Sequence, residues 1–274
     1  MTFKAACIQN TATPDVQHDI AVLTRLIRQA AAAQAQFIAT PEYCAGLASR
    51  DGKLHPVAPR EGEHPVLPAM QALARELSIW LLVGSIGVTG SDGRIHNRSF
   101  MIAPDGSVAA RYDKIHLFDV DLGEGRVYRE SGTITPGTKA VISPCVEGSI
   151  GLSICYDLRF AALYRTYAQA GADMLAVPAA FTKVTGEAHW HVLQRARAIE
   201  NGAYVIAPGQ CGTLSGGSQC YGHSLIVDPW GRVLADGGEA EGFIIADVDL
   251  EQVQLTRSRI PSLRHDRAFA PPVA

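Results

Sequence analysis

Two stretches of this chain carry the same pattern of residues at a constant displacement, and this internal repeat limits the folds that the chain can adopt. Each stretch holds a Pro-x-Gly segment between two strand-like runs, which predicts a β-hairpin. The matching positions are Ser99, Pro104, Gly106, Val108 and Ala110 in the first copy and Ser224, Pro229, Gly231, Val233 and Ala235 in the second. A repeated hairpin indicates a chain built from two related halves.

The match extends upstream of both hairpins. Residues 35–41 and 172–178 read as short apolar strands that end in proline, and each follows a segment that predicts a helix, over 15–34 and 157–171. A further match in the same order joins residues 74–83 and 198–207. Each half therefore predicts strand, helix, strand, helix, strand and hairpin, with right-handed crossovers between parallel strands. Because two such halves can bury their bare sheet faces on each other, we expect an α/β fold, a four-layer α-β-β-α sandwich of two pseudo-symmetric halves.

Three polar residues occur in one copy of the repeat only. Glu42 follows the proline of the first half, where the second half has Ala179; Lys114 follows the first hairpin; and Cys155 ends the opening strand of the second half. Ligands bind beyond the carboxyl ends of strands in α/β sheets. A helix that starts at once after Cys155 would aim free N–H groups at the sulfur, lower the pKa of the thiol and stabilise an oxyanion.

A carboxylate, an ammonium and a thiol in one pocket are suited to acyl transfer. The thiol attacks a carbonyl, the carboxylate handles its proton and the ammonium stabilises the oxyanion. Spacing alone leaves other interpretations open: Cys155 as a buried core cysteine, Lys114 as a surface lysine paired with Asp113, and Glu42 as a loop carboxylate.

Composition excludes several classes of function. The 274 residues carry a net charge of −3, which provides no basic surface for nucleic acid, and no apolar run approaches the roughly 20 residues of a membrane helix. The first residues lead directly into a strand-like run, so we expect no signal peptide. Six scattered cysteines favour reduced thiols in the cytoplasm over a disulfide framework.

We also predict no metal and no cofactor. Cys220-x-x-His223 and His189-Trp190-His191 do not form a four-ligand pattern, and the spacing of the glycines in 84–90 does not match a phosphate-binding loop.

Three ordered motifs resemble the nitrilase superfamily of carbon–nitrogen hydrolases over nearly the whole chain. They are Pro41-Glu42-Tyr43, the segment 112–118 (YDKIHLF) and the segment 151–160 (GLSICYDLRF). The resemblance implies the α-β-β-α sandwich and a triad of Glu42 as base, Lys114 as oxyanion stabiliser and Cys155 as nucleophile. It also implies a second glutamate, Glu130, that orients Lys114 or the reacting groups, and an oxyanion contact from the Tyr156 backbone N–H.

Within this superfamily the chain resembles the Nit branch, through segments 188–190, 195–200, 221–224 and 228–231. Gln210-Cys211-Gly212 favours amidases of deaminated glutathione over the sibling ω-amidases. The implied reaction is hydrolysis of a non-peptide C–N bond in a small carboxylate-bearing amide, through a cysteine thioester. Side chains expected to contact the substrate are Tyr43, Arg159, Phe181, Thr182 and His189.

The resemblance further implies a homodimer or higher homo-oligomer. We expect one hydrolase domain over residues 1–259 and a tail, 260–274, at a subunit interface. Apolar residues Tyr164, Tyr167 and Ala168 on the helix over 157–171 would supply surplus apolar area for such an interface.

Other functions remain open from the residues alone. A serine hydrolase would use Ser153, although the segment lacks the second glycine of G-x-S-x-G. A papain-like Cys–His enzyme would use His116, His189 or His223 as its base. The ω-amidase that acts on 2-oxoglutaramate, a nitrilase proper with the same triad, and a catalytically silent binding protein of the same fold are the remaining alternatives.

Overall fold

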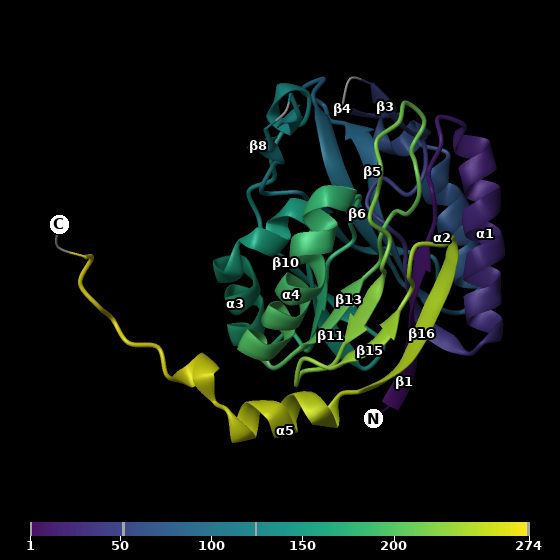
Figure 1. Ribbon diagram of the computed structural model, residues 1–274. Helices are drawn as coiled ribbons and strands as arrows, with labels where there is room; N and C mark the ends of the chain where they lie inside the picture. Colours follow the sequence, from purple (N-terminus) through teal and green to yellow (C-terminus); the bar gives the residue numbers. More distant parts are fainter. Residues whose placement is uncertain (1, 51–52, 124, 273–274) are drawn as a thin grey trace.

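The computed structural model describes residues 2–50, 53–123 and 125–272 (Figure 1). Its strands are β1 (Thr2–Gln9), β2 (Ala35–Ala39), β3 (Leu47–Arg50), β4 (Lys53–Pro56), β5 (Trp80–Thr89), β6 (Ile95–Ile102), β7 (Val108–Asp113), β8 (Asp119–Asp121), β9 (Val127–Arg129), β10 (Val141–Cys145), β11 (Gly148–Leu152), β12 (Met174–Ala176), β13 (Tyr204–Ala207), β14 (Leu225–Val227), β15 (Val233–Asp236) and β16 (Gly242–Asp249). Its α-helices are α1 (Val16–Ala32), α2 (Val66–Leu77), α3 (Ala161–Gln169), α4 (Lys183–Asn201) and α5 (Glu251–Arg259).

Within these described residues the strands form two six-stranded sheets of the same design. Their orders are β16-β1-β2-β5-β6-β7 and β10-β11-β12-β13-β14-β15. In both sheets three parallel strands are followed by two antiparallel strands, and an antiparallel strand flanks the opening one. The shared strand order confirms the two related halves, and both predicted hairpins are present, as β6–β7 and β14–β15.

The layers follow from the two faces of each strand. Along β1, Phe3, Ala5 and Cys7 pack into the core between the two sheets, whereas Ala6 and Ile8 pack against α1 and α2. Figure 1 shows α1 and α2 on one side of the sandwich and α3 and α4 on the other. The α-β-β-α sandwich predicted from the repeat is confirmed.

Local chemistry explains how the helices are placed. Asp15 precedes α1 and its carboxylate accepts the N–H groups of Gln17 and His18, which satisfies two free donors of the first turn. The buried stripe of α1 then recurs at helical spacing, at Leu23, Leu26, Ile27 and Ala30. None of the helices formed by the described residues has the length and apolarity needed to cross a membrane.

The segment after Cys155 differs from the prediction. It forms a short 3-10 helix, Cys155–Arg159, before α3 begins at Ala161. Tyr164, Tyr167 and Ala168 are buried in the core of the subunit, so the expectation that they offer surplus apolar surface was wrong. The Tyr167 hydroxyl donates a hydrogen bond of 2.5 Å to the Leu152 carbonyl, and this aromatic ring fills the space over β11.

The chain beyond β16 leaves the sandwich. Helix α5 runs along one end of the two sheets, and Figure 1 shows the following residues extending away from the body. Arg257 of α5 donates to the carbonyls of Asn201 and Ala172. Farther along, Asp266 accepts hydrogen bonds from Arg165 and Gln169 of α3. The start of the tail is thus attached to the second half, while Phe269 is 90% exposed.

The proline-terminated strands of both halves meet over one glycine. A Cβ atom at Gly84, in β5, would lie 1.9 Å from the Thr40 carbonyl oxygen, 2.5 Å from that of Pro41 and 2.6 Å from Cβ of Pro178. Only glycine allows this approach, which brings the ends of β2 and β12 together.

We therefore expect Gly84→Ala to lower the free energy of unfolding by roughly 3 kcal/mol, because the methyl group collides with backbone rather than with a mobile side chain. Gly62→Ala is the control, since nothing lies within 4 Å of a Cβ there; it should change stability by less than about 0.5 kcal/mol. Urea unfolding followed by circular dichroism measures both. Native stability of the Gly84 variant would contradict this account of the strand ends.

Candidate active site

Three buried side chains from distant parts of the chain meet at the carboxyl ends of the sheets. Glu42 follows β2, Lys114 follows β7 and Cys155 follows β11. Their exposed fractions are 1%, 2% and 8%, so bulk water is largely excluded. Lys114 Nζ lies 2.9 Å from Glu42 Oε1. Cys155 lines the same cavity as Glu42 and Lys114, and the charges of both act on its thiol.

Each carboxylate oxygen of Glu42 accepts a hydrogen bond from a group other than Lys114. Oε1 accepts a hydrogen bond of 2.8 Å from Asn97 Nδ2, and Oε2 accepts one of 2.7 Å from the Ala180 N–H. Ala180 follows β12 in the second half, so this carboxylate is oriented by both halves. Such fixed partners hold the carboxylate in one position toward the thiol.

Glu130 completes the charge cluster around Lys114. Its two carboxylate oxygens lie 3.1 and 2.9 Å from Lys114 Nζ, and Oε2 also accepts the Phe118 N–H at 2.6 Å. Burial disfavours the charged ammonium, but the negative charges of Glu130 and Glu42 outweigh it and raise the pKa of Lys114 well above its usual value. Lys114 therefore remains a cation.

The backbone at Cys155 is strained. Its φ of 49° lies in the left-handed region, which is rare for a residue with a side chain. The Cys155 N–H donates 2.9 Å to the Pro178 carbonyl, which fixes the turn.

The acidity of this thiol differs from the expectation. Burial and the negative charge of Glu42 raise the pKa of Cys155 well above 9, although Lys114 opposes the shift. The expectation that N–H groups alone would lower the pKa was wrong, because burial and a neighbouring carboxylate act more strongly. The resting site holds a neutral thiol beside a carboxylate that can accept its proton.

Asp157 ties the lysine segment to the cysteine turn. One carboxylate oxygen accepts the Tyr112 hydroxyl at 2.7 Å and the Ile154 N–H at 2.9 Å, and the other accepts the His116 N–H at 2.9 Å. Tyr112 and His116 flank Lys114 in sequence, and Ile154 precedes Cys155. This buried carboxylate therefore sets the position of the ammonium relative to the sulfur.

The triad faces a cavity of about 220 Å³. Of the side chains predicted to contact substrate, Tyr43, Phe181 and Thr182 line this cavity, as does Tyr156. Arg159 and His189 are not among the lining residues. The Arg159 guanidinium lies instead over the rings of Tyr156 and Phe181, 5.7 and 5.6 Å from their centroids, behind the cavity wall.

Two alternatives lose support from this geometry. Ser153 is buried and donates to the Ala176 carbonyl, outside the cavity lining. His116, His189 and His223 are likewise absent from the lining, so none of these three histidines is placed as a base for Cys155.

Sequence reasoning missed Asn97, which contacts Glu42 without lining the cavity, and several residues that do line it. Asn97 contacts Glu42 and lies 3.5 Å from Glu130, and its counterpart in the second copy of the repeat is Gly222. The same comparison between copies that singled out Glu42 could therefore have found Asn97. The missed residues that line the cavity could not be found by comparing the copies, because they lie in loops or outside the repeat. They include Lys53, Leu54, His55, Phe118, Tyr128, Arg129, Leu214 and Cys220.

No carboxylate of the triad region is free for a metal ion, since Glu42 and Glu130 both hold Lys114. In the described part of the chain, one group has metal-binding geometry: His191, His223 and Asp236. It lies outside the cavity lining.

Comparison with known proteins agrees with this geometry. The family model "Carbon-nitrogen hydrolase" matches residues 4–258. A deaminated glutathione amidase from Synechocystis is 40% identical over 271 residues, covering 96% of this chain and 97% of the relative. Human omega-amidase NIT2 is 34% identical over 267 residues, covering 97% of this chain and 96% of that protein.

A solved structure agrees as well. The Caenorhabditis elegans NitFhit protein superposes with a TM-score of 0.86 at 32% identity, over 97% of this chain and 65% of the NitFhit chain. With sequence, fold and the meeting of carboxylate, ammonium and thiol in agreement, this chain belongs to the carbon–nitrogen hydrolase family of the nitrilase superfamily.

Proposed function

We propose that this amidase hydrolyses a small carboxylate-bearing amide through a thioester on Cys155, and that deaminated glutathione is its substrate. The observation that carries the mechanism is the ion pair of Lys114 and Glu42, 2.9 Å apart, with the Cys155 thiol beside it in the same cavity. The relatives named as deaminated glutathione amidases carry the choice of substrate.

In the first half-reaction Cys155 Sγ attacks the amide carbonyl carbon while Glu42 takes the thiol proton. The electron pair of the carbonyl moves to its oxygen, where Lys114 Nζ and the Tyr156 N–H stabilise it. The Tyr156 N–H has no hydrogen-bond partner within the described part of the chain. When the C–N bond breaks, Glu42 gives the proton to the leaving nitrogen, and the amine departs: cysteinylglycine from deaminated glutathione, or ammonia from a primary amide such as 2-oxoglutaramate.

In the second half-reaction Glu42 removes a proton from water as the water oxygen attacks the thioester. Breaking the C–S bond releases the carboxylic acid, and the thiol recovers its proton from Glu42. Glu130 remains paired with Lys114 throughout and positions it. The raised pKa of Cys155 makes a base necessary, because little thiolate exists before the substrate arrives.

Two cationic side chains at the cavity support a substrate that carries carboxylate groups. Lys53 and Arg129 line the cavity and neither is buried. Each could pair with a carboxylate remote from the scissile amide, while Thr182 and Tyr43 supply polar contacts. Human omega-amidase NIT2 is also similar over nearly its whole length, so an ω-amidase acting on 2-oxoglutaramate is the second candidate.

A hydrolysis assay tests this function, in which release of the free amine is followed for deaminated glutathione and release of ammonia for the primary amides and nitriles. Deaminated glutathione should give a higher kcat/KM than 2-oxoglutaramate, glutamine, asparagine or simple nitriles. Cys155→Ala should lose activity on all of them, since the proposed thioester forms on the sulfur that this change removes. Mass spectrometry of substrate-treated protein should find the acyl group on Cys155. Activity confined to 2-oxoglutaramate or nitriles would contradict deaminated glutathione as the substrate. Native rates in Cys155→Ala would contradict the thioester mechanism.

Lys114→Met should lower kcat by about 10²–10³, because one oxyanion donor is lost. It should also destabilise the fold, since two buried carboxylates would be left without their cation. Lys139→Met, at an exposed lysine, is the matched control and should change neither property. A folded Lys114→Met protein with near-native kcat would remove Lys114 from the proposed site.

Glu42→Gln should lower the pKa of Cys155, because the charge of Glu42 raises it. The absorbance of the Cys155 thiolate is measured as the difference between the native protein and Cys155→Ala. In the native protein this thiolate should not yet have formed at pH 9, where an ordinary cysteine is half ionised. In Glu42→Gln it should appear at lower pH, even though catalysis is lost. Exposed Glu63→Gln should leave the titration unchanged. An upward shift in Glu42→Gln would contradict the contact.

We further propose a homodimer or larger homo-oligomer, with residues 1–259 as the hydrolase domain and the tail from 260 contacting another subunit. Support comes from Phe269 on the extended tail and from Val192 and Ile199 on α4, which are 67% and 51% exposed. Six cysteines without disulfides favour a cytoplasmic location.

A further inference from the structure

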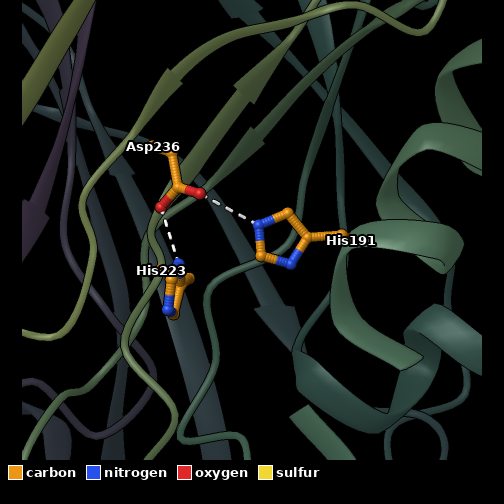
Figure 2. A group of neighbouring side chains, drawn as sticks. All are labelled: His191, His223 and Asp236. Atoms are coloured by element: carbon orange, nitrogen blue, oxygen red, sulfur yellow. Dashed lines mark hydrogen bonds and ion pairs between the residues drawn. The ribbon is translucent and has the colours of Figure 1, made fainter. Parts of the chain in front are cut away.

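Two histidines and an aspartate meet between α4 and the β14–β15 hairpin, outside the lining of the catalytic cavity. His191 lies in the middle of α4, His223 precedes β14 and Asp236 ends β15. Figure 2 shows both imidazole rings directed at the Asp236 carboxylate. His191 Nε2 lies 3.0 Å from Oδ2, and His223 Nδ1 lies 2.8 Å from Oδ1.

We propose that these three side chains form a binding site for a divalent transition metal ion, of which zinc fits best. Their ligand atoms all lie within 4.8 Å of one another. Two imidazole nitrogens and one carboxylate oxygen form a common three-residue zinc set that leaves a fourth position for water. Imidazole nitrogen also distinguishes this site from calcium or magnesium sites, which are built from oxygen ligands.

The distances are within reach of such an ion. Zinc lies about 2.0–2.1 Å from nitrogen and oxygen ligands, so ligand atoms at the corners of a tetrahedron are roughly 3.3 Å apart. The two histidines contact different oxygens of Asp236, at 3.0 and 2.8 Å, and all the ligand atoms lie within 4.8 Å of one another. The widest separation would therefore have to close by at most about 1.5 Å around one ion. The side chains are 33%, 23% and 35% exposed for His191, His223 and Asp236, so an ion can enter from solvent.

Neighbouring groups hold the ligands in place without a metal. The Tyr221 ring stacks on His223 with centroids 4.5 Å apart, and its hydroxyl lies 3.4 Å from His191 Nδ1. That contact leaves His191 Nε2 as the nitrogen that faces the carboxylate. The Gly238 N–H donates 2.9 Å to Asp236 Oδ1. Partners of this kind orient metal ligands and tune their affinity.

The expected role of the ion is structural. None of the three ligands lines the catalytic cavity, but helix α4 begins directly after Thr182, which does. The Trp190 indole N–H donates to the His223 carbonyl at 2.7 Å, beside the site. An ion held here would join α4 to the β14–β15 hairpin and so stiffen one wall of the cavity. The proposal does not depend on the substrate or on the catalytic mechanism.

Calorimetric titration of the chelator-treated Cys155→Ala protein with Zn²⁺ tests the site, because this background removes the Cys155 thiol, one of the two that line the cavity, as a rival ligand. We expect one ion per chain and an increase in melting temperature on binding. Co²⁺ should bind in its place and give the visible spectrum of a tetrahedral site. Affinity should fall with acidity, since a protonated imidazole cannot coordinate a metal ion.

His191→Ala should lower the zinc affinity about 100-fold or more, because loss of an orienting partner alone costs about 10–100-fold. Alanine suits the interior of a helix, so this variant should fold. Tyr221→Phe should lose about tenfold, and Asp236→Asn should behave like His191→Ala. His189→Ala, on the same helix two residues away, is the control. Absence of stoichiometric zinc binding, equal binding in His191→Ala and His189→Ala, or preference for Ca²⁺ would overturn the proposal.

Discussion

The proposed active site depends on one ammonium group buried between two carboxylates. An isolated charge at 2% exposure would be strongly unfavourable, so Lys114 can remain charged only while Glu42 and Glu130 stay beside it. The same cluster keeps Glu42 next to the thiol and raises the pKa of Cys155. Asn97 and the Ala180 N–H then hold the carboxylate from opposite halves of the molecule. The ion pairs that stabilise the buried Lys114 therefore also position the groups proposed to carry out the reaction.

Much of the architecture could be predicted because the chain contains its pattern twice. Matching Pro-x-Gly segments located both hairpins, and strands ending at Pro41 and Pro178 located the parallel core. Comparing the copies also separated repeated structure from residues present once, which is why Glu42, Lys114 and Cys155 stood out. The family resemblance then supplied Glu130, which no periodicity marks.

What failed to be predicted depends on three-dimensional surroundings. The acidity of Cys155 was predicted in the wrong direction because burial and a carboxylate 113 positions distant in sequence decide it. Tyr164 and Tyr167 were placed on the surface because helical spacing does not say which face meets the sheet. His191, His223 and Asp236 were missed as a group, since each looks ordinary in its own segment and only folding unites them.

Because the proposed site is built from groups of both halves, the order in which the chain is synthesised decides when the site can form. The carboxylate and the ammonium are made early, whereas the nucleophile and the amide that orients Glu42 arrive with the second half. A nascent chain that carries only the first half therefore holds no complete reactive centre. The first sheet itself stays incomplete until the last strand, β16, is made and pairs with β1, so the catalytic fold is complete only after nearly the whole chain has been synthesised.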